Sequence, residues 1–298
     1  MTVAVPHADE DVPVFWDSLG LPGLIDVHTH FMPPRLMERV WEHFENAGPL
    51  IKMEWPINYR YDEAERLARL RAMGVQAFTA LVYPHKPDMA QWLNGWAVEF
   101  ASRTPDCLHT ATFYPEPGVD AYVQQAIDNG ARVFKAHLQV GGYDPRDRLL
   151  TPVWGLLAEA GIPVIVHAGS GPVPGPFTGP EPFSAVMAAH PRLPAVIAHL
   201  GLPEHEEFLA LADRYPNVMF DTTMAFTDFS LRGQPPSARL VARLRELPDR
   251  VLFGTDFPNI PYAYAHQLEA LARLDLGDEW LRNVCYGNAA TLFTLARP

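Results

Sequence analysis

An alternation of short apolar strands with helices constrains the fold more than any other feature of the sequence. It begins at Leu24 and continues to the C-terminal end of the chain. Several strands contain nearly continuous apolar runs such as VIV and AVIA, which are typical of parallel strands buried on both faces. We predict eight strands, and each of the first seven is followed by a helix before the next strand begins. The predicted strands cover residues 24–30, 75–84, 108–115, 131–138, 162–169, 194–201, 218–223 and 250–256.

Eight strand–helix units in one chain of 298 residues predict a TIM (β/α)8 barrel. An open doubly wound sheet is the alternative, but the Gly-x-Gly-x-x-Gly turn of that fold does not follow the first predicted strand. With 48% hydrophobic and 19% charged residues, the chain can bury the core that a barrel needs. We therefore expect one barrel domain over residues 23–298, ending in two helices at about 262–275 and 278–295.

Two segments fall outside this alternation. Residues 1–22 are rich in proline and acidic residues, and we expect them to form an irregular N-terminal arm on the outside of the barrel. Residues 48–62 are rich in aromatic residues and are longer than an ordinary strand-to-helix connection. This second segment is either a cover over an active site or a packed surface loop.

The composition argues against several kinds of partner. Lys+Arg 23 against Asp+Glu 35 gives a formal net charge of −12, which disfavours nucleic acids and anionic membranes. The N-terminus lacks a basic segment followed by an apolar core, and no apolar run is long enough to span a membrane. Cys107 and Cys285 match no zinc or redox spacing, so we expect two reduced thiols. These features predict a cytoplasmic protein whose partner is a small-molecule substrate.

Residues able to bind metals or transfer protons end six of the predicted strands. In a (β/α)8 barrel the active site lies at the C-terminal ends of the strands, so we expect these side chains to converge. The two histidines of the first strand are two residues apart, which places both imidazoles on the same face. In chain order, the residues at strand ends are His28, His30, Lys135, His137, His167, His199, Asp221 and Asp256.

The types of these residues predict a site for one divalent metal such as zinc. His28, His30, His167 and Asp256 supply three imidazoles and one carboxylate, which leaves room for a water molecule. The metal would lower the pKa of that water and generate a nucleophile. Asp256 could also exchange a proton with the water, while His199 is placed as a general acid or base.

The other strand-end residues have two interpretations each. His137 either hydrogen-bonds the substrate or has a structural role, and Asp221 either orients a ligand histidine or is structural. Lys135 forms a buried ion pair within the barrel, or it is a carbamylated lysine that bridges two metals.

The motifs IDVHTH, IVHAG, AHLG and FGTDFP, in this order along the chain, resemble those of the amidohydrolase superfamily. The closest resemblance is to the group that contains aminocarboxymuconate-semialdehyde decarboxylase and the resorcylate decarboxylases. It extends from Ile25 to the YGNA sequence near the C-terminus. The resemblance implies a barrel whose metal ligands are His28, His30, His167 and Asp256, with His199 as the catalytic histidine. It also implies zinc as the usual ion, manganese as the alternative, and a homodimer as a common assembly.

The sequence departs from the decarboxylases at Lys135, a position where they need no lysine. Binuclear hydrolases use a lysine there as the bridge between two metals, so the number of metals stays open. Aromatic residues near strand ends favour an aromatic or apolar substrate, and cationic residues in the same regions are candidates to bind a substrate carboxylate. The candidate substrate-binding residues are His137, Arg60, Trp55, Tyr143 and Phe226.

Three functions fit these features. The first is a metal-dependent hydrolase that acts on a small cyclic amide, lactone or ester. The second is a metal-dependent nonoxidative decarboxylase of an aromatic or enolisable acid. The third is a barrel that binds metal or ligand without catalysis, which is disfavoured because buried polar groups are costly to keep without a use. Lys135 and the lack of an evident pair of arginines favour hydrolysis over decarboxylation.

Overall fold

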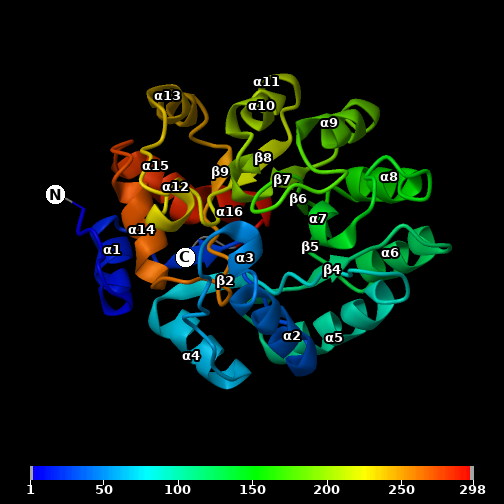
Figure 1. The fold of residues 1–298 in the computed structure, drawn as a ribbon, viewed down its shortest axis with the longest axis horizontal. Coiled ribbons are helices and arrows are strands. Elements are labelled where there is room, and N and C mark those ends of the chain that lie inside the picture. The colour runs from blue at the N-terminus through cyan, green and yellow to red at the C-terminus, as the bar shows by residue number, and fades with distance from the viewer. Residues whose placement is uncertain (1–2, 296–298) are drawn as a thin grey trace. The chain divides into compact units, whose positions relative to one another are not determined.

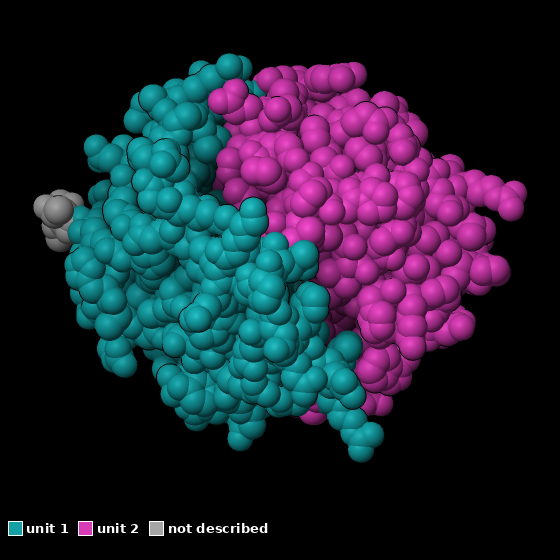
Figure 2. All heavy atoms as spheres, viewed as in Figure 1, with its two compact units in different colours: residues 1–30, 35–78, 221–298 teal, residues 31–34, 79–220 magenta. Residues whose placement is uncertain are grey.

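In the computed structural model, which describes residues 3–295, the chain divides into two units. Unit 1 comprises residues 3–30, 35–78 and 221–295, and unit 2 comprises residues 31–34 and 79–220 (Figure 2). Each unit combines strands with helices. No helix in the described part of the chain is long and apolar enough to cross a membrane.

Unit 1 contains the two ends of the chain and the first and last strands (Figure 1). Its strands β1 and β2 pair in parallel, with Ile25 opposite Ala77 and Asp26 opposite Phe78. Its elements are η1 (Asp9–Asp11), α1 (Val12–Ser18), β1 (Leu24–Asp26), α2 (Pro34–Glu45), α3 (Gly48–Ile51), α4 (Glu63–Ala72), β2 (Val75–Thr79), α12 (Asp228–Leu231), α13 (Ala238–Glu246), β9 (Val251–Leu252), α14 (Tyr264–Ala272), α15 (Asp278–Arg282), the π-helical turn η3 (Asn283–Gly287) and α16 (Asn288–Leu292).

Unit 2 contains a run of parallel strands in the order β4-β5-β6-β7-β8, so that neighbours in sequence are neighbours in the sheet. Helices α5, α6, α8 and α9 lie outside these strands (Figure 1). The elements are α5 (Ala90–Arg103), β3 (Cys107–Leu108), β4 (Thr110–Thr112), α6 (Val119–Asp128), β5 (Val133–His137), α7 (Leu138–Gly141), α8 (Thr151–Ala160), β6 (Val164–His167), α9 (Pro180–Ala189), β7 (Ala195–Ile197), η2 (Ala198–Gly201), α10 (His205–Leu209), α11 (Leu211–Arg214) and β8 (Val218–Asp221).

The apolar runs account for the strands of unit 2. The apolar residues of β6, Val164, Ile165 and Val166, are fully buried although they point alternately to the two faces. Burial on both faces is the condition that the continuous apolar pattern predicted. Helix α8 also follows its sequence signals, since a proline stands in its first turn and Gly161 ends it with a positive φ of 64°.

The prediction of an irregular N-terminal arm is wrong. The segment contains η1 and α1, and α1 buries Val12 and Phe15 completely. The indole of Trp16 donates a hydrogen bond to the carbonyl of Met73 at 3.0 Å. Proline and acidic residues suggested irregular backbone, but a proline in the first turn of a helix costs no hydrogen bond.

Several predicted elements are shorter or more broken than expected. The first strand ends at Asp26, the strand predicted over 194–201 ends at Ile197, and the one predicted over 250–256 ends at Leu252. The strand predicted over 108–115 is split into β3 and β4. The loop over 48–62 begins with α3. Four of the polar residues predicted at strand ends, His28, His30, His199 and Asp256, therefore lie after their strands, whereas Lys135, His137, His167 and Asp221 lie within β5, β6 and β8.

Candidate functional site

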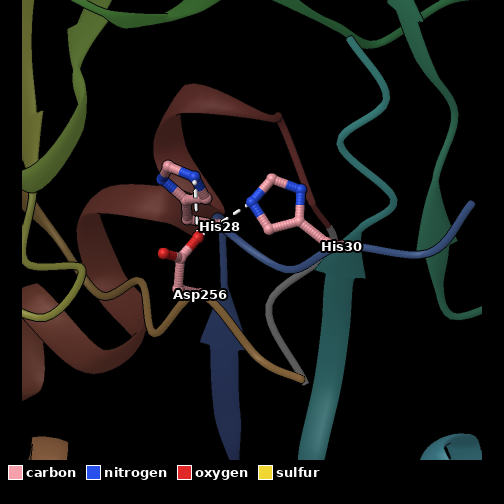
Figure 3. Close-up of side chains that lie close together, drawn as sticks. All are labelled: His28, His30 and Asp256. Atoms are coloured by element: carbon pink, nitrogen blue, oxygen red, sulfur yellow. Dashed lines mark hydrogen bonds and ion pairs between the residues drawn. The ribbon is translucent and has the colours of Figure 1, made fainter. Parts of the chain in front are cut away.

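Three side chains of unit 1, His28, His30 and Asp256, form a buried group that we call the metal triad (Figure 3). One potential ligand atom from each lies within 4.8 Å of the other two. The Nε2 atom of His30 is 2.8 Å from Oδ1 of Asp256, and Nε2 of His28 is 3.5 Å from the same oxygen. All three residues are buried, at 1%, 3% and 7% exposed.

The metal triad is assembled by backbone hydrogen bonds between two segments that are far apart in sequence. After β1, the N–H of His30 donates to the carbonyl of Phe257 at 2.7 Å, and the N–H of Asp256 donates to the carbonyl of His28 at 2.8 Å. Asp256 has a φ of 75°, a left-handed conformation that is rare for residues other than glycine. Backbone strain of this kind is concentrated at functional sites, where the surrounding structure maintains it.

Gly254 permits the close approach of these segments. A Cβ atom at this position would lie 2.4 Å from Oγ1 of Thr223 and 2.8 Å from Cβ of His28. Contacts this short do not occur between real Cβ atoms and their neighbours, so any larger residue must displace the metal triad or the residues that support it.

Asp221 fixes the orientation of His28. Its Oδ2 atom lies 2.8 Å from Nδ1 of His28, and both side chains are buried. A carboxylate accepts this hydrogen bond, so the neutral imidazole carries its proton on Nδ1 and its lone pair on Nε2, the nitrogen nearer Asp256. The interpretation of Asp221 as the partner that orients a ligand histidine agrees with this contact.

A second carboxylate, Asp26, lies beneath the metal triad. Its Oδ1 accepts the N–H of His28 at 3.1 Å, and its Oδ2 accepts the hydroxyls of Thr255 at 2.6 Å and Tyr264 at 3.0 Å. Complete burial raises the pKa of Asp26 from 3.8 to about 7, against the lowering effect of its hydrogen bonds. This residue was not among the predicted site residues, although an acid in an otherwise apolar strand is a visible signal in LIDVHTH.

The donor atoms of the metal triad fit a divalent cation. In a tetrahedral zinc site, ligand atoms about 2.1 Å from the metal lie about 3.4 Å apart, close to the 3.5 Å between Nε2 of His28 and Oδ1 of Asp256. Two imidazoles and one carboxylate, backed by Asp221, are a donor set suited to zinc and other divalent transition metals.

A separate group of histidines lies in unit 2. The rings of His137 and His167 stack at a centroid distance of 4.1 Å with an angle of 11° between their planes. The ring of His199 meets that of His167 edge-on at 4.7 Å. The ring of Tyr83 lies 4.8 Å from that of His137. We call His137, His167 and His199 the histidine stack.

Backbone groups determine the tautomers in the histidine stack. Nε2 of His167 lies 2.9 Å from the carbonyl of Gly171, so it donates its hydrogen and leaves the lone pair on Nδ1. Nδ1 of His137 accepts the N–H of Val140 at 3.3 Å and caps helix α7. His199 follows β7 in a left-handed turn with φ 56°, so it projects from a turn rather than from a strand end.

Lys135 is fully buried on β5, two residues before His137. Its backbone carbonyl accepts the hydroxyl of Thr112 at 2.8 Å, and it lies opposite Ile165 in the parallel ladder. Side chains two apart on a strand share a face, so Lys135 and His137 project to the same side of β5. Whether Lys135 bridges two metals stays a prediction.

The candidate substrate-binding residues are in varied surroundings. Trp55 is buried, donates to the carbonyl of Asn259 at 2.7 Å and packs edge-on against Phe229 at 4.9 Å. Arg60 is more exposed and forms ion pairs with two acidic residues, Glu38 and Glu45. Tyr143 and Phe226 are buried, and Phe226 has a left-handed φ of 66°. Binding of substrate by these four residues and by His137 stays a prediction.

A family model described as amidohydrolase matches residues 25–295. No curated protein sequence matches the chain. Among solved structures, an uncharacterised TIM-barrel protein from Bordetella bronchiseptica has a TM-score of 0.72 at 22% identity, over 91% of this chain and 99% of its own.

Two further structures carry a named activity. A protein assigned as a 2-pyrone-4,6-dicarboxylic acid hydrolase from Pseudomonas putida has a TM-score of 0.63 at 17% identity, over 93% of this chain and 99% of its own. The 5-carboxyvanillate decarboxylase of Novosphingobium aromaticivorans, with bound manganese and 3-methoxy-4-hydroxy-5-nitrobenzoic acid, has a TM-score of 0.61 at 15% identity, over 93% and 99% of the two chains. These likenesses confirm the predicted (β/α)8 barrel fold, and the match to the family model confirms the resemblance drawn from the motifs.

Proposed function

Since the chain belongs to the amidohydrolase family, we propose that it is a metal-dependent hydrolase that opens a small cyclic amide, lactone or ester. The observation that carries this proposal is the metal triad, His28, His30 and Asp256, buried within unit 1 with its donor atoms clustered. Asp221 supports it by holding His28 in the tautomer that presents Nε2.

We propose His167 as a further ligand through Nδ1, the nitrogen that its hydrogen bond to Gly171 leaves with a lone pair. Zinc is the proposed ion, with manganese as the alternative that the decarboxylase structure contains. A bound metal of this kind polarises a carbonyl and lowers the pKa of a coordinated water towards neutrality.

The remaining chemistry belongs to the chain's own residues. Asp256 is the proposed acceptor for the proton of the attacking water, since its carboxylate lies within the metal triad. His199 is the proposed acid that protonates the leaving group. Its ring packs against that of His167 at 4.7 Å, which restricts its orientation.

One observation favours hydrolysis over decarboxylation. Besides the metal, an arginine could hold the carboxylate of a decarboxylase substrate, and Arg60 was a candidate for this role. Its guanidinium is already paired with Glu38 at 2.9 Å and with Glu45 at 2.5 Å. Decarboxylation of an aromatic acid remains the second candidate, because a 5-carboxyvanillate decarboxylase shares the fold.

The test uses the protein purified without chelator and reconstituted with zinc or manganese. Hydrolysis of at least one member of a panel of lactones, cyclic amides and esters is expected, and His28→Ala should abolish it. Release of carbon dioxide from hydroxybenzoate-type acids, with no hydrolysis of the panel, would establish the decarboxylase instead. If neither reaction occurs while metal is bound at one equivalent, the barrel binds metal without either chemistry.

A further inference from the structure

Helix α14 of unit 1 receives its N-terminal cap from a distant part of the chain. The residue at its own N-cap position is Ala263, which has no side chain able to accept a hydrogen bond. Oδ1 of Asp9 accepts the N–H of Ala265 at 3.0 Å, although 256 residues separate the two in sequence. A carboxylate at this end of a helix satisfies a free N–H and interacts favourably with the helix dipole.

The hydroxyl of Tyr59 links Asp9 to the backbone of the buried residue Tyr264. It donates to the other carboxylate oxygen of Asp9 and accepts the N–H of Tyr264 at 2.6 Å. Tyr59 is 1% exposed, and burial together with the negative charge of Asp9 raises the pKa of Tyr59. The phenol therefore keeps its proton and remains a donor to Asp9.

Tyr264 takes part in this series of hydrogen bonds through both its backbone N–H and its side-chain hydroxyl. Its hydroxyl donates to Oδ2 of Asp26 at 3.0 Å, and the same oxygen accepts the hydroxyl of Thr255 at 2.6 Å. Oδ1 of Asp26 holds the N–H of His28 at 3.1 Å. Tyr264, Asp26 and Thr255 are all fully buried.

This series of hydrogen bonds thus reaches two members of the metal triad, His28 and Asp256. His28 is held directly through its N–H, and Asp256 is held through its neighbours, since Oγ1 of Thr255 also accepts the N–H of Phe257 at 3.0 Å. Buried hydrogen bonds that are each satisfied restrict one another's geometry, because breaking any of them leaves a buried polar group without a partner.

We propose that Asp9, in the N-terminal segment, is a positioning residue for the metal triad and acts through Tyr59, Tyr264 and Asp26. This inference rests on the proposed metal-dependent function, and it gives the N-terminal segment a role in the site in addition to its packing. Asp9 sets the position of α14 and Tyr59, and these two hold the Tyr264 hydroxyl against Asp26.

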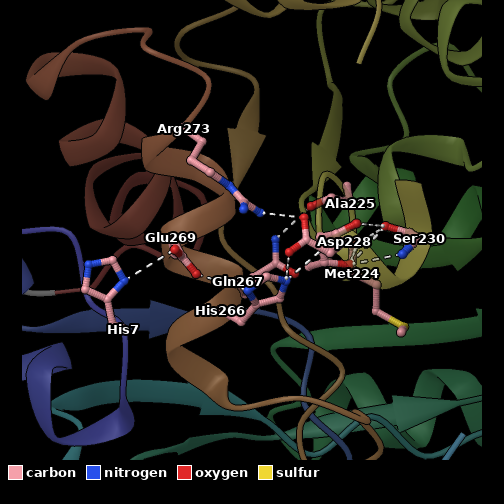
Figure 4. Close-up of polar contacts among 10 residues, drawn as sticks. His7, Met224, Ala225, Asp228, Ser230, His266, Gln267, Glu269 and Arg273 are labelled. Atoms are coloured by element: carbon pink, nitrogen blue, oxygen red, sulfur yellow. Dashed lines mark hydrogen bonds and ion pairs between the residues drawn. The ribbon is translucent and has the colours of Figure 1, made fainter. Parts of the chain in front are cut away.

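A second contact between the N-terminal segment and α14 provides a control. Nδ1 of His7 lies 3.3 Å from Glu269, which also contacts His266, and His266 contacts Asp228 at the start of α12 (Figure 4). The side chain of His7 is 75% exposed, so its ion pair is screened by solvent. His7 contacts helix α14, as Asp9 does, but it is not part of the buried series of hydrogen bonds that leads from Asp9 to Asp26.

The test compares Asp9→Ala with His7→Ala by measuring the dissociation constant for zinc in competition with a chelator. We expect Asp9→Ala to weaken zinc binding about 3- to 10-fold and Tyr264→Phe about 10-fold, at the low end of effects of residues behind metal ligands. His7→Ala should bind zinc as the wild type does. Asp9→Asn serves if Asp9→Ala does not fold, and it should give a smaller effect of the same sign.

A readout in the metal-free protein separates this inference from the proposed function. The ring ¹⁵N resonances of His28, assigned by their loss in His28→Gln, should shift in Asp9→Ala and stay unchanged in His7→Ala. If the wild type binds no zinc, the proposed function fails, and the ¹⁵N shifts alone then decide the positioning role. Asp9→Ala with a lower melting temperature but unchanged zinc affinity and unchanged His28 resonances would overturn it.

Discussion

The two histidine groups of this protein are held in different ways. In the metal triad of unit 1, the two imidazoles contact carboxylates, His28 through Asp221 and His30 through Asp256. In the histidine stack of unit 2, the rings contact backbone groups, one another and the ring of Tyr83. His167 donates to the carbonyl of Gly171, and its ring stacks on that of the neighbouring histidine.

This difference indicates that the two histidine groups have different roles. A carboxylate behind an imidazole fixes its tautomer, increases its basicity and adds the negative charge that a divalent cation needs. A backbone carbonyl fixes the tautomer without adding charge. We therefore expect the histidines of unit 1 to contribute more to metal affinity than His167, which contacts the carbonyl of Gly171. The proton transfer that we propose belongs to His199, whose ring packs against that of His167.

Among the substitutions that distinguish the metal triad from the histidine stack, we expect the largest effect for His199→Asn. Loss of a general acid should lower kcat about 10²- to 10⁴-fold, while zinc content stays at the wild-type level. The matched control is His190→Gln, a substitution of a partly exposed histidine that ends helix α9. Loss of zinc from His199→Asn would show instead that the residue is a ligand.

The next effect is expected for Asp221→Asn, which removes the charge behind His28 and keeps the shape of the side chain. Zinc affinity should fall about 10- to 100-fold, as measured by competition with a chelator. Asp228→Asn is the control, since Asp228 begins helix α12 and its carboxylate is 70% exposed. Equal effects of the two substitutions would contradict a specific role for Asp221.

A smaller effect is expected for Gly254→Ala, because the added Cβ atom meets Thr223 and His28. Overpacking of this kind should lower the free energy of unfolding by about 1–3 kcal/mol, measured by denaturant titration of the metal-free protein. Gly95→Ala on helix α5 is the control, since nothing lies within 4 Å of its added Cβ atom and alanine favours helix. It should leave the protein equally stable or slightly more stable.

The two units should also differ in how their stability depends on pH. The pKa of Asp26 is raised from 3.8 to about 7, so between these values the folded metal-free protein holds a proton that the unfolded chain has released. Its contribution to stability is therefore present below pH 4 and is lost as the pH rises to about 7, by about 1.4 kcal/mol per pH unit at most. Asp26→Asn should lack this component when unfolding is followed from pH 4 to 8.

Unit 2 should show the opposite dependence. Burial lowers the pKa of His205 below its ordinary value of 6.5, so the unfolded chain binds a proton that the folded protein does not. Stability should fall as the pH falls below about 6.5, and His205→Gln should reduce this loss. The same pH dependence in Asp26→Asn and in the wild type would contradict the account of unit 1.

The sequence was sufficient to predict which residues meet in unit 1. His28, His30 and Asp256 stand at the ends of predicted parallel strands, and such ends converge in a barrel. It was not sufficient to predict how they are held. The left-handed backbone of Asp256 depends on contacts with a segment more than 200 residues away, and so do the hydrogen bonds that Asp26 accepts from Thr255 and Tyr264.

The irregular arm predicted for residues 1–22 is wrong for a related reason. Local composition described the proline and acidic residues correctly, but the burial of Phe15 and the cap that Asp9 gives to α14 are tertiary contacts. The split of the strand predicted over 108–115 is of the same kind, since an apolar pattern shows which residues are buried but not where pairing between strands stops.

If the metal triad of unit 1 binds the metal, its removal should empty the site. This can be tested by measuring the zinc or manganese content of protein purified without chelator, by elemental analysis of the wild type, His28→Ala and Asp256→Asn. We expect about one metal per chain in the wild type and almost none in either variant. Two metals per chain would make Lys135 the bridge between them, and a wild-type metal content retained in both variants would show that the metal triad does not bind the metal.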